Sequence, residues 1–137
     1  MGAGNATGMM VPNGWYPGYK NTASQAMVAE YAKQYKVSTS SVGADVAEAY
    51  SVGQVAAAAI EATGGTDNAK IISYLHSGGT LQTVQGAVKF DSLGENSLAA
   101  AFIFQWNKKG TNFQHVLPAG TGSVAVLNPK PNWVTTG

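Results

Sequence analysis

His76 and His115 are the only histidines in this 137-residue sequence, and histidine is the side chain most suited to acid–base catalysis near neutral pH. Acid–base catalysis or metal binding would need partner groups, but neither histidine has a second histidine or a carboxylate at metal-ligand spacing. No Gly-x-Ser-x-Gly nucleophile elbow occurs. We expect His76 to cap carbonyl groups at a helix end and His115 to occupy a solvated strand position. A small hydrolase built around these histidines is the alternative to a non-enzymatic protein.

Two further motifs could hold a ligand. The glycine-rich stretch Gly2–Gly8 superficially resembles a phosphate loop, but no strand precedes it and no Lys-Ser/Thr pair closes it. Asp45 and Glu48 form an i,i+3 carboxylate pair at the expected start of a helix, where negative charge offsets the macrodipole. Contact with a ligand is the alternative for this pair. The sequence therefore predicts no nucleotide, no metal ion and no cofactor.

An aromatic loop is the more informative motif. Trp15, Tyr16 and Tyr19 lie within a segment rich in turn-forming proline and glycine. Clustered exposed aromatic side chains often mark a binding surface. Packing of the same side chains against a neighbouring element is an equally good interpretation.

Composition excludes several classes of protein. Eight lysines, no arginine and seven acidic residues give a formal net charge of +1, and only 11% of residues are charged. The lysines are scattered, so no nucleic-acid-binding surface is expected. Without cysteine there is no disulfide or thiolate site, and without a long apolar run neither a membrane span nor a targeting segment is expected. Length alone favours one domain of about 100–150 residues.

The elements that must position these residues are helical in the first part of the chain. A short strand is expected to end at Pro12, before the aromatic loop. A helix follows from Thr22, which stands in capping-box spacing with Gln25. A longer helix is predicted over Val42–Thr63, and a shorter one over Asp67–His76. Three apolar stripes are expected to be buried: Met27, Val28, Tyr31, Ala32 and Tyr35; Val46, Ala49, Tyr50, Gly53, Ala56, Ala57 and Ile60; and Ile71, Ile72 and Leu75.

After residue 80 the pattern becomes extended. Thr83–Phe90 alternates between polar and apolar residues and predicts a strand, and Asp91–Gly94 predicts a turn. A second strand over Leu98–Trp106 is expected to pass through a turn at Asn107–Gly110 into a third strand over Asn112–Pro118. The sequence therefore predicts an α/β protein in which three helices precede a β-hairpin region.

Three stretches, in order, resemble the C-terminal part of the type I substrate-binding proteins of ABC importers, the branched-chain amino-acid-binding family. Glu48–Ala62 is similar to the family's alanine-rich helix, and Thr83–Gly94 to its t-V-x-G-x-v-x-F-D-x-x-G signature. Gln105-Trp106, followed by Val116–Pro118 and Pro129–Trp133, resembles the family's C-terminal pattern. Ser51 departs from the family, which often has Asp at this position.

The resemblance implies a fold and a function. Residues 1–137 would form the C-terminal segment of a two-lobe extracellular ligand-binding domain, without the N-terminal lobe and its ligand-gripping Ser/Thr loop. The parent protein would be periplasmic or extracytoplasmic, would capture an amino acid or similar small polar solute by lobe closure, and would deliver it to an ABC permease. A ligand-sensing domain of a receptor or regulator with the same fold is the alternative.

By resemblance, the loop after the first strand and the start of the long helix approach the ligand cleft. These segments predict six ligand contacts: Asn13, Trp15, Tyr16, Ala47, Glu48 and Tyr50. Aromatic rings would supply contact area and the Glu48 carboxylate would pair with a ligand ammonium group. For Tyr50, core packing is the alternative, because it shares a stripe with Val46 and Ile60.

An incomplete domain has a further consequence. Leu98–Trp106 and the alanine-rich helix would expose apolar surface that the rest of the parent buries. We therefore expect the isolated chain to bind no ligand with useful affinity and to form a homo-oligomer, in the extreme case as an inactive self-associating fragment.

Overall fold

The computed structural model describes residues 3–110, 112–120 and 122–131, which form two compact units. One unit joins Met1–Asn13 to Ala101–Gly137 and is called the strand unit here. The other unit, Gly14–Ala100, is called the helical unit. The chain passes between the units twice, so two compact units replace the single domain that length alone favours.

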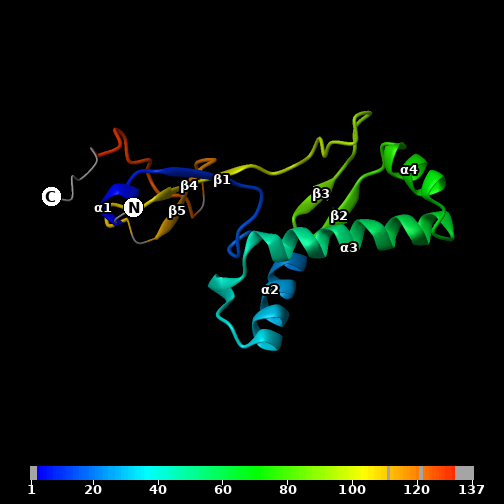
Figure 1. Ribbon diagram of the computed structural model, residues 1–137, viewed down its shortest axis with the longest axis horizontal. Helices are drawn as coiled ribbons and strands as arrows, with labels where there is room; N and C mark the ends of the chain where they lie inside the picture. Colours follow the sequence, from blue (N-terminus) through cyan, green and yellow to red (C-terminus); the bar gives the residue numbers. More distant parts are fainter. Residues whose placement is uncertain (1–2, 111, 121, 132–137) are drawn as a thin grey trace. The chain divides into compact units, whose positions relative to one another are not determined.

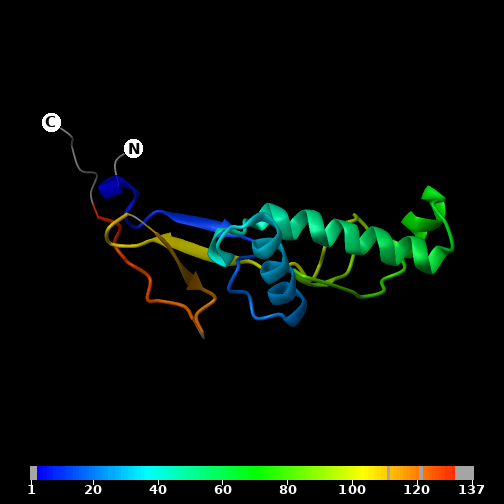
Figure 2. The ribbon, with the colours of Figure 1, turned by 90° about the horizontal axis from the view of Figure 1, so that it is seen from below.

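The helical unit is built around one long helix. Its elements are α2 (Thr22–Tyr35), the 3₁₀ turn η1 (Thr39–Ser41), α3 (Ala44–Thr63), α4 (Asn68–His76), β2 (Leu81–Thr83) and β3 (Gly86–Val88). Helix α3 lies between α2 on one side and the antiparallel β2–β3 hairpin on the other (Figure 1). It runs from α2 at one end to α4 at the other (Figure 2). The three predicted helices are thus confirmed.

The ends of these helices follow from local hydrogen bonding. Asn21, not Thr22, is the N-cap of α2, because its side-chain oxygen accepts from the Ser24 N–H at 3.0 Å. The predicted capping role of Thr22 is therefore wrong. Gln25 instead donates to the Pro17 and Tyr19 carbonyl oxygens and so fixes the aromatic loop against the helix. Helix α3 ends as predicted at Gly64, whose φ of 70° is in the left-handed region.

The core of the helical unit forms around Trp15. This side chain is fully buried, and its indole Nε1–H donates to the buried Ser24 Oγ at 2.8 Å. The aromatic loop therefore contributes its largest side chain to packing rather than to an exposed surface. The other buried members of the core come from α2, the segment before α3, α3 itself and the hairpin: Met27, Val28, Val42, Ala47 and Val84.

The buried face of α3 differs from the predicted stripe. Ala47, Ser51 and Ala59 are buried, whereas Tyr50 is 52% exposed and Ile60 is 39% exposed. The prediction that Tyr50 packs in the core is therefore wrong. In an alanine-rich helix several faces are equally apolar, and the small side chains on this face allow β2 to approach closely.

Two further predictions of burial are wrong. Tyr35 at the end of α2 is 56% exposed, although Met27, Val28 and Ala32 of its predicted stripe are buried. On α4, Ile72 is 58% exposed, and no residue of this helix is buried. Both helices therefore present apolar side chains that the helical unit itself does not cover.

The extended segment after residue 80 forms a hairpin rather than one strand. Thr83 Oγ1 accepts from the Gln85 N–H at 3.1 Å and donates to the Gly86 carbonyl oxygen at 2.9 Å. Gly86 adopts a φ of 107°, which suits glycine. These contacts reverse the chain between β2 and β3, so the single predicted strand over Thr83–Phe90 is wrong. The turn at Asp91–Gly94 is confirmed, since the Gly94 N–H donates to the Asp91 carbonyl oxygen at 3.1 Å.

The strand unit is a three-stranded antiparallel sheet. It contains the short helix α1 (Ala3–Ala6) and strands β1 (Met10–Asn13), β4 (Phe102–Trp106) and β5 (Phe113–Leu117), in the order β1-β4-β5. Strand β1 continues through Pro12, where the sequence predicted its end, because an edge strand tolerates a residue without an N–H donor. Strand β4 begins at Phe102 and is shorter than predicted. The predicted turn before β5 is confirmed by a 2.8 Å bond from the Gly110 N–H to the Asn107 carbonyl oxygen.

A buried amide holds the strand unit together. The Gln105 side chain is 3% exposed and donates to the carbonyl oxygens of Gly8 and Leu127 at 3.0 and 2.9 Å. Its Oε1 accepts from the Leu127 N–H at 2.7 Å. One side chain therefore ties together three segments that are far apart in the sequence. The predicted motif residues Asn132 and Trp133 lie outside the described residues.

Candidate functional site

The five predicted ligand contacts that belong to the helical unit do not form one cluster. Trp15 and Ala47 are fully buried in the core of the helical unit. Asn13 belongs to the other unit, where it pairs with Phe102 at the end of β1. The ring of Tyr16 lies 6.4 Å from that of Tyr19 within the aromatic loop. The ligand-contact role remains a prediction for all six, and burial makes Trp15 and Ala47 core residues of this chain.

Tyr50 lies in a groove between α2 and α3, which we call the tyrosine groove. The groove has a volume of about 540 Å³. Its lining comes from seven positions of α2, two of α3 and one of the hairpin: Ala23, Ala26, Met27, Glu30, Tyr31, Gln34, Tyr35, Tyr50, Gln54 and Val84. The Gln54 Oε1 accepts from the Val84 N–H at 2.9 Å, so the floor of the groove is anchored. Three tyrosines and one carboxylate thus share one open groove.

Glu48 lies in a second groove, the α3–α4 groove, of about 470 Å³. Ile71 and Leu75 of α4 face the α3 side of this groove, and the hairpin contributes Val88. Ser51 also lines it, with a buried hydroxyl group that has no hydrogen-bond partner among the described residues. Because almost all of the lining surface is apolar, this groove offers mainly hydrophobic contact.

The strand unit has a groove of a different character, of about 770 Å³. Lys108 and Lys109 lie on its rim, with the side-chain amides of Asn112 and Gln114 beside them. The segment 124–128 lines it as well. The sequence of the strand unit contains three lysines and no aspartate or glutamate. The two lysines are the charged side chains among its lining residues, so this groove is positively charged.

The histidines take structural places. His115 is partly buried rather than solvated: its ring centroid lies 5.5 Å from those of Phe102 and Phe104, and its Nε2 bonds the Leu117 carbonyl oxygen at 2.9 Å. The prediction of a solvated His115 is therefore wrong. His76 is exposed at the end of α4, where it was expected, but Ser77 caps this helix, with its Oγ donating to the Tyr74 carbonyl oxygen at 2.6 Å. The main-chain N–H groups of Glu95 and Leu93, with a smaller contribution from His76, hold the pKa of Asp91 below its ordinary value of 3.8.

Within residues 3–110, 112–120 and 122–131, no group of three or more His, Cys, Asp or Glu side chains is placed to hold a metal ion. In the same part of the chain, no helix combines the length and hydropathy needed to cross a membrane.

Sequence reasoning missed the tyrosine groove. Tyr31 and Tyr35 were expected in the core, because their spacing matches the buried stripe of α2. The available signal was their i,i+4 spacing, which places two aromatic rings side by side on one helix face. The sequence does not show that Tyr31 packs only partly against the core while Tyr35, one turn later, stays 56% exposed.

Comparison with known proteins places these features in a family. A family model described as periplasmic binding protein matches residues 1–111. No curated protein gives a significant sequence match.

Two solved structures have a similar fold. An ABC transporter substrate-binding protein from Desulfitobacterium hafniense, in complex with leucine, has a TM-score of 0.68 and 19% identity. This match covers 81% of the present chain and 32% of that protein. The leucine-binding protein LivK from Thermotoga maritima has a TM-score of 0.65 and 20% identity. This match covers 80% of the present chain and 30% of LivK. The chain thus spans about a third of the length of these proteins.

The family match covers most of the sequence, and the fold agrees with it. Periplasmic binding proteins bind solutes without transforming them, so the expectation of a non-enzymatic protein is met. The chain belongs to the periplasmic binding protein family.

Proposed function

We propose that this chain is part of a solute-binding protein that captures an amino acid, or a similar small polar solute, for an ABC importer. The observation that carries the proposal is the family match over residues 1–111. Both similar structures are of proteins named for transport or leucine binding, and one contains leucine. Such a protein acts outside the cytoplasmic membrane, where its cargo is the solute and its partner is the permease.

The division of the chain into two units supports capture by closure. A binding protein that closes on its solute needs two bodies joined by chain crossings, which act as hinges. This chain has two crossings, after Asn13 and after Ala100. We infer that the strand unit and the helical unit are portions of the two bodies, and that 1–137 is the C-terminal segment of the whole. Asn13 and Tyr16 then flank one crossing and are proposed to contact the solute.

A calorimetric titration with the twenty amino acids tests the proposal. The chain spans about a third of the similar structures, so we expect no binding in the low-micromolar range by residues 1–137 alone. We expect at least one amino acid to bind the full encoded protein, and Tyr16→Ala to weaken that binding about tenfold. Ser92→Ala, in an exposed turn, is the matched control and leaves the affinity unchanged.

Either of two results would contradict this function. Low-micromolar binding by the isolated chain would show that the chain is complete as a binding module. Absence of binding by the full encoded protein, or an encoded protein that ends at these residues, would exclude amino-acid capture by a larger parent.

We also propose that the isolated chain self-associates. The observations that favour this are the exposed apolar side chains of several elements, with Val52 69%, Ile72 58% and Leu98 47% exposed. Surfaces of this kind drive association when no other part of a protein covers them. Sedimentation velocity should detect dimers or larger species at high concentration, and a stable monomer there would refute the proposal.

A further inference from the structure

The tyrosine groove combines aromatic faces from two helices. The rings of Tyr31 and Tyr35 lie one turn apart on α2, with centroids separated by 4.4 Å and planes inclined by 37°. Tyr50 lines the same groove from α3. Tyr35 and Tyr50 are 56% and 52% exposed, so their ring surfaces remain open to a ligand. An aromatic face carries negative electrostatic potential and attracts a cation placed over it.

The charge of the groove is negative, like the electrostatic potential of the ring faces. Among the described residues, Glu30 is the only charged residue that lines it. Its one ion pair, with Lys33, has a 4.0 Å separation between two highly exposed side chains, so the carboxylate is only weakly engaged. The rings of Tyr31 and Tyr35 also lie in the last turns of α2, toward the negative end of the helix macrodipole. Carboxylate, ring faces and helix end all favour a positive ligand.

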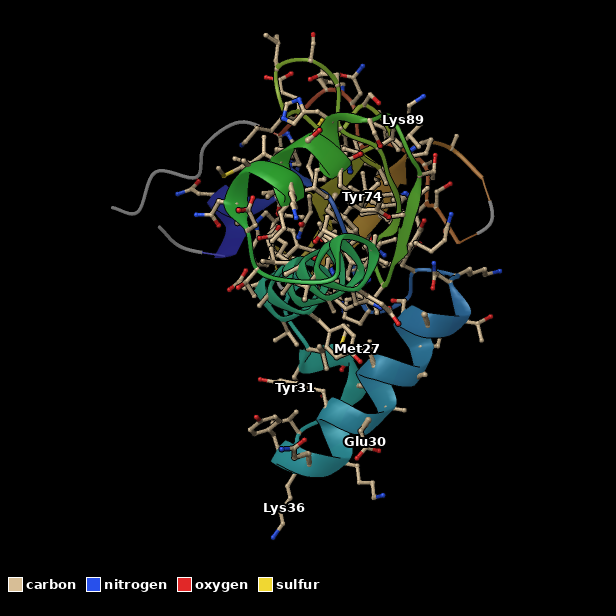
Figure 3. All side chains as sticks on the ribbon, turned by 90° about the vertical axis from the view of Figure 1, so that its right-hand side faces the viewer. Met27, Glu30, Tyr31, Lys36, Tyr74 and Lys89 are labelled. Atoms are coloured by element: carbon tan, nitrogen blue, oxygen red, sulfur yellow. The ribbon has the colours of Figure 1, made fainter. Side chains whose placement is uncertain are left out.

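The floor of the groove selects the kind of cation. Met27 and Val84 are buried beneath it, and Ala23 and Ala26 line the wall of α2. An apolar floor with one carboxylate does not supply the many oxygen ligands that a metal ion needs. It does suit the methyl groups of an alkylated ammonium ion. Figure 3 shows Met27, Glu30 and Tyr31 following one another along α2, on the opposite side of α3 from Tyr74 and Lys89.

We propose that the tyrosine groove binds organic cations of the alkylammonium class. The cation lies against the rings of Tyr31, Tyr35 and Tyr50, its substituents rest on the apolar floor, and Glu30 supplies the counter-charge. Lys33 and Lys36 project from the same end of α2 and oppose the ligand's charge, so binding is weak and strengthens as Glu30 is freed from Lys33. The site shares Tyr50 with the predicted amino-acid contacts, but binding of a cation here does not require amino-acid capture.

A pair of probes isolates the charge. Choline and its neutral carbon isostere, 3,3-dimethylbutan-1-ol, have nearly the same shape and differ in one positive charge. Titration of residues 1–137 with each probe, followed by two-dimensional NMR, should shift signals of the groove residues. We expect choline to bind at least fivefold more tightly than the alcohol, and Lys33→Gln to strengthen choline binding about twofold. Equal affinity for the two probes, or no shift with choline at tens of millimolar, would overturn the proposal.

Variants separate ring recognition from folding. Tyr35→Leu and Tyr50→Leu should each weaken choline binding about threefold, because each removes one exposed cation–π contact. Tyr35→Phe should retain binding, since the ring face remains. Tyr74→Leu is the matched control on α4, outside the groove, and leaves binding unchanged. A loss with Tyr74→Leu equal to that with Tyr35→Leu would assign the effect to folding and overturn the site, whether or not the full protein captures an amino acid.

Discussion

The two units of this chain are stabilised in different ways. The helical unit packs an apolar core around Trp15, with one buried polar contact to Ser24. The strand unit is held by Gln105, whose buried amide makes three hydrogen bonds to main-chain groups of Gly8 and Leu127. An apolar core tolerates rearrangement but loses free energy when a cavity opens, whereas a buried amide requires every partner to stay in place. The comparison therefore predicts where each unit is fragile.

Charge separates the units as well. All seven aspartate and glutamate residues lie in the helical unit, together with five of the eight lysines. The remaining three lysines belong to the strand unit. Grooves in the two units accordingly differ in sign: the tyrosine groove has one carboxylate, and the groove of the strand unit has two lysines. We expect the two units to favour ligands of opposite charge.

Removal of the indole in Trp15→Ala should give the largest effect. The change opens a cavity in the core and leaves the buried Ser24 hydroxyl without its donor, for a loss of about 3–5 kcal/mol in the free energy of unfolding. Hydrogen exchange should show the loss in α2 and α3, and little change in β4 and β5. Trp15→Phe keeps most of the volume and should lose less. Equal deprotection of both units would show that the two units do not have separate sources of stability.

Gln105→Leu should destabilise the strand unit by about 2–4 kcal/mol, because it leaves main-chain groups of Gly8 and Leu127 unpaired in a buried place. The amide of Leu127 should exchange faster with solvent, while the amides of α3 keep their rates. Gln114→Leu, on an exposed position of β5, is the matched control. If both leucine variants behave alike, the buried network does not hold this unit.

Asn21→Ala should lower the free energy of unfolding of the helical unit by about 1 kcal/mol, through loss of the helix cap on α2. Thr22→Ala is the matched control, since Thr22 is exposed and Asn21 is the cap. Denaturant titration followed by circular dichroism measures both. A larger loss with Thr22→Ala would restore the capping box predicted from the sequence.

The smallest effect concerns Asp91 and pH. Its pKa is lowered in the folded chain, mainly by main-chain N–H donors, so its contribution to stability is present above the unfolded value of 3.8 and is lost as pH falls through the lower folded value. The N–H signals of Leu93 and Glu95 should therefore titrate with a midpoint below 3.8, and Asp91→Asn should abolish that titration. A midpoint above 3.8 would contradict the role of these hydrogen bonds.

The sequence predicts the elements better than their buried faces. Helix limits follow from local signals, such as Gly64 after α3, and the turn at Asn107–Gly110 likewise depends on nearby residues. Which face of α3 is buried depends on the approach of the hairpin, and an alanine-rich helix carries no local signal for it. Trp15 was not predictable for a similar reason, because an aromatic residue in a loop rich in proline and glycine has no periodic pattern. Its full burial and its contact with Ser24 are visible only in the structure.

The candidate site was less predictable still. All six predicted contacts came from two short segments, 13–16 and 47–50, and the structure distributes them among strand β1, the aromatic loop, the core and two grooves. A resemblance in sequence indicates which positions correspond to ligand contacts in the family. Whether a side chain at such a position faces a ligand depends on the parts of the fold that pack around it. Glu30 and Tyr35 were missed for this reason, because the groove that they line is formed by α3 and the hairpin packing beside α2.

Calorimetric titration with leucine and then the other amino acids, run side by side on residues 1–137 and on the full encoded protein, tests whether this chain is part of an amino-acid-binding protein. We expect the full protein to bind leucine or another amino acid, and the 137-residue chain to bind none in the low-micromolar range. Equal affinity in both proteins, or binding of no amino acid by the full protein, would contradict this expectation.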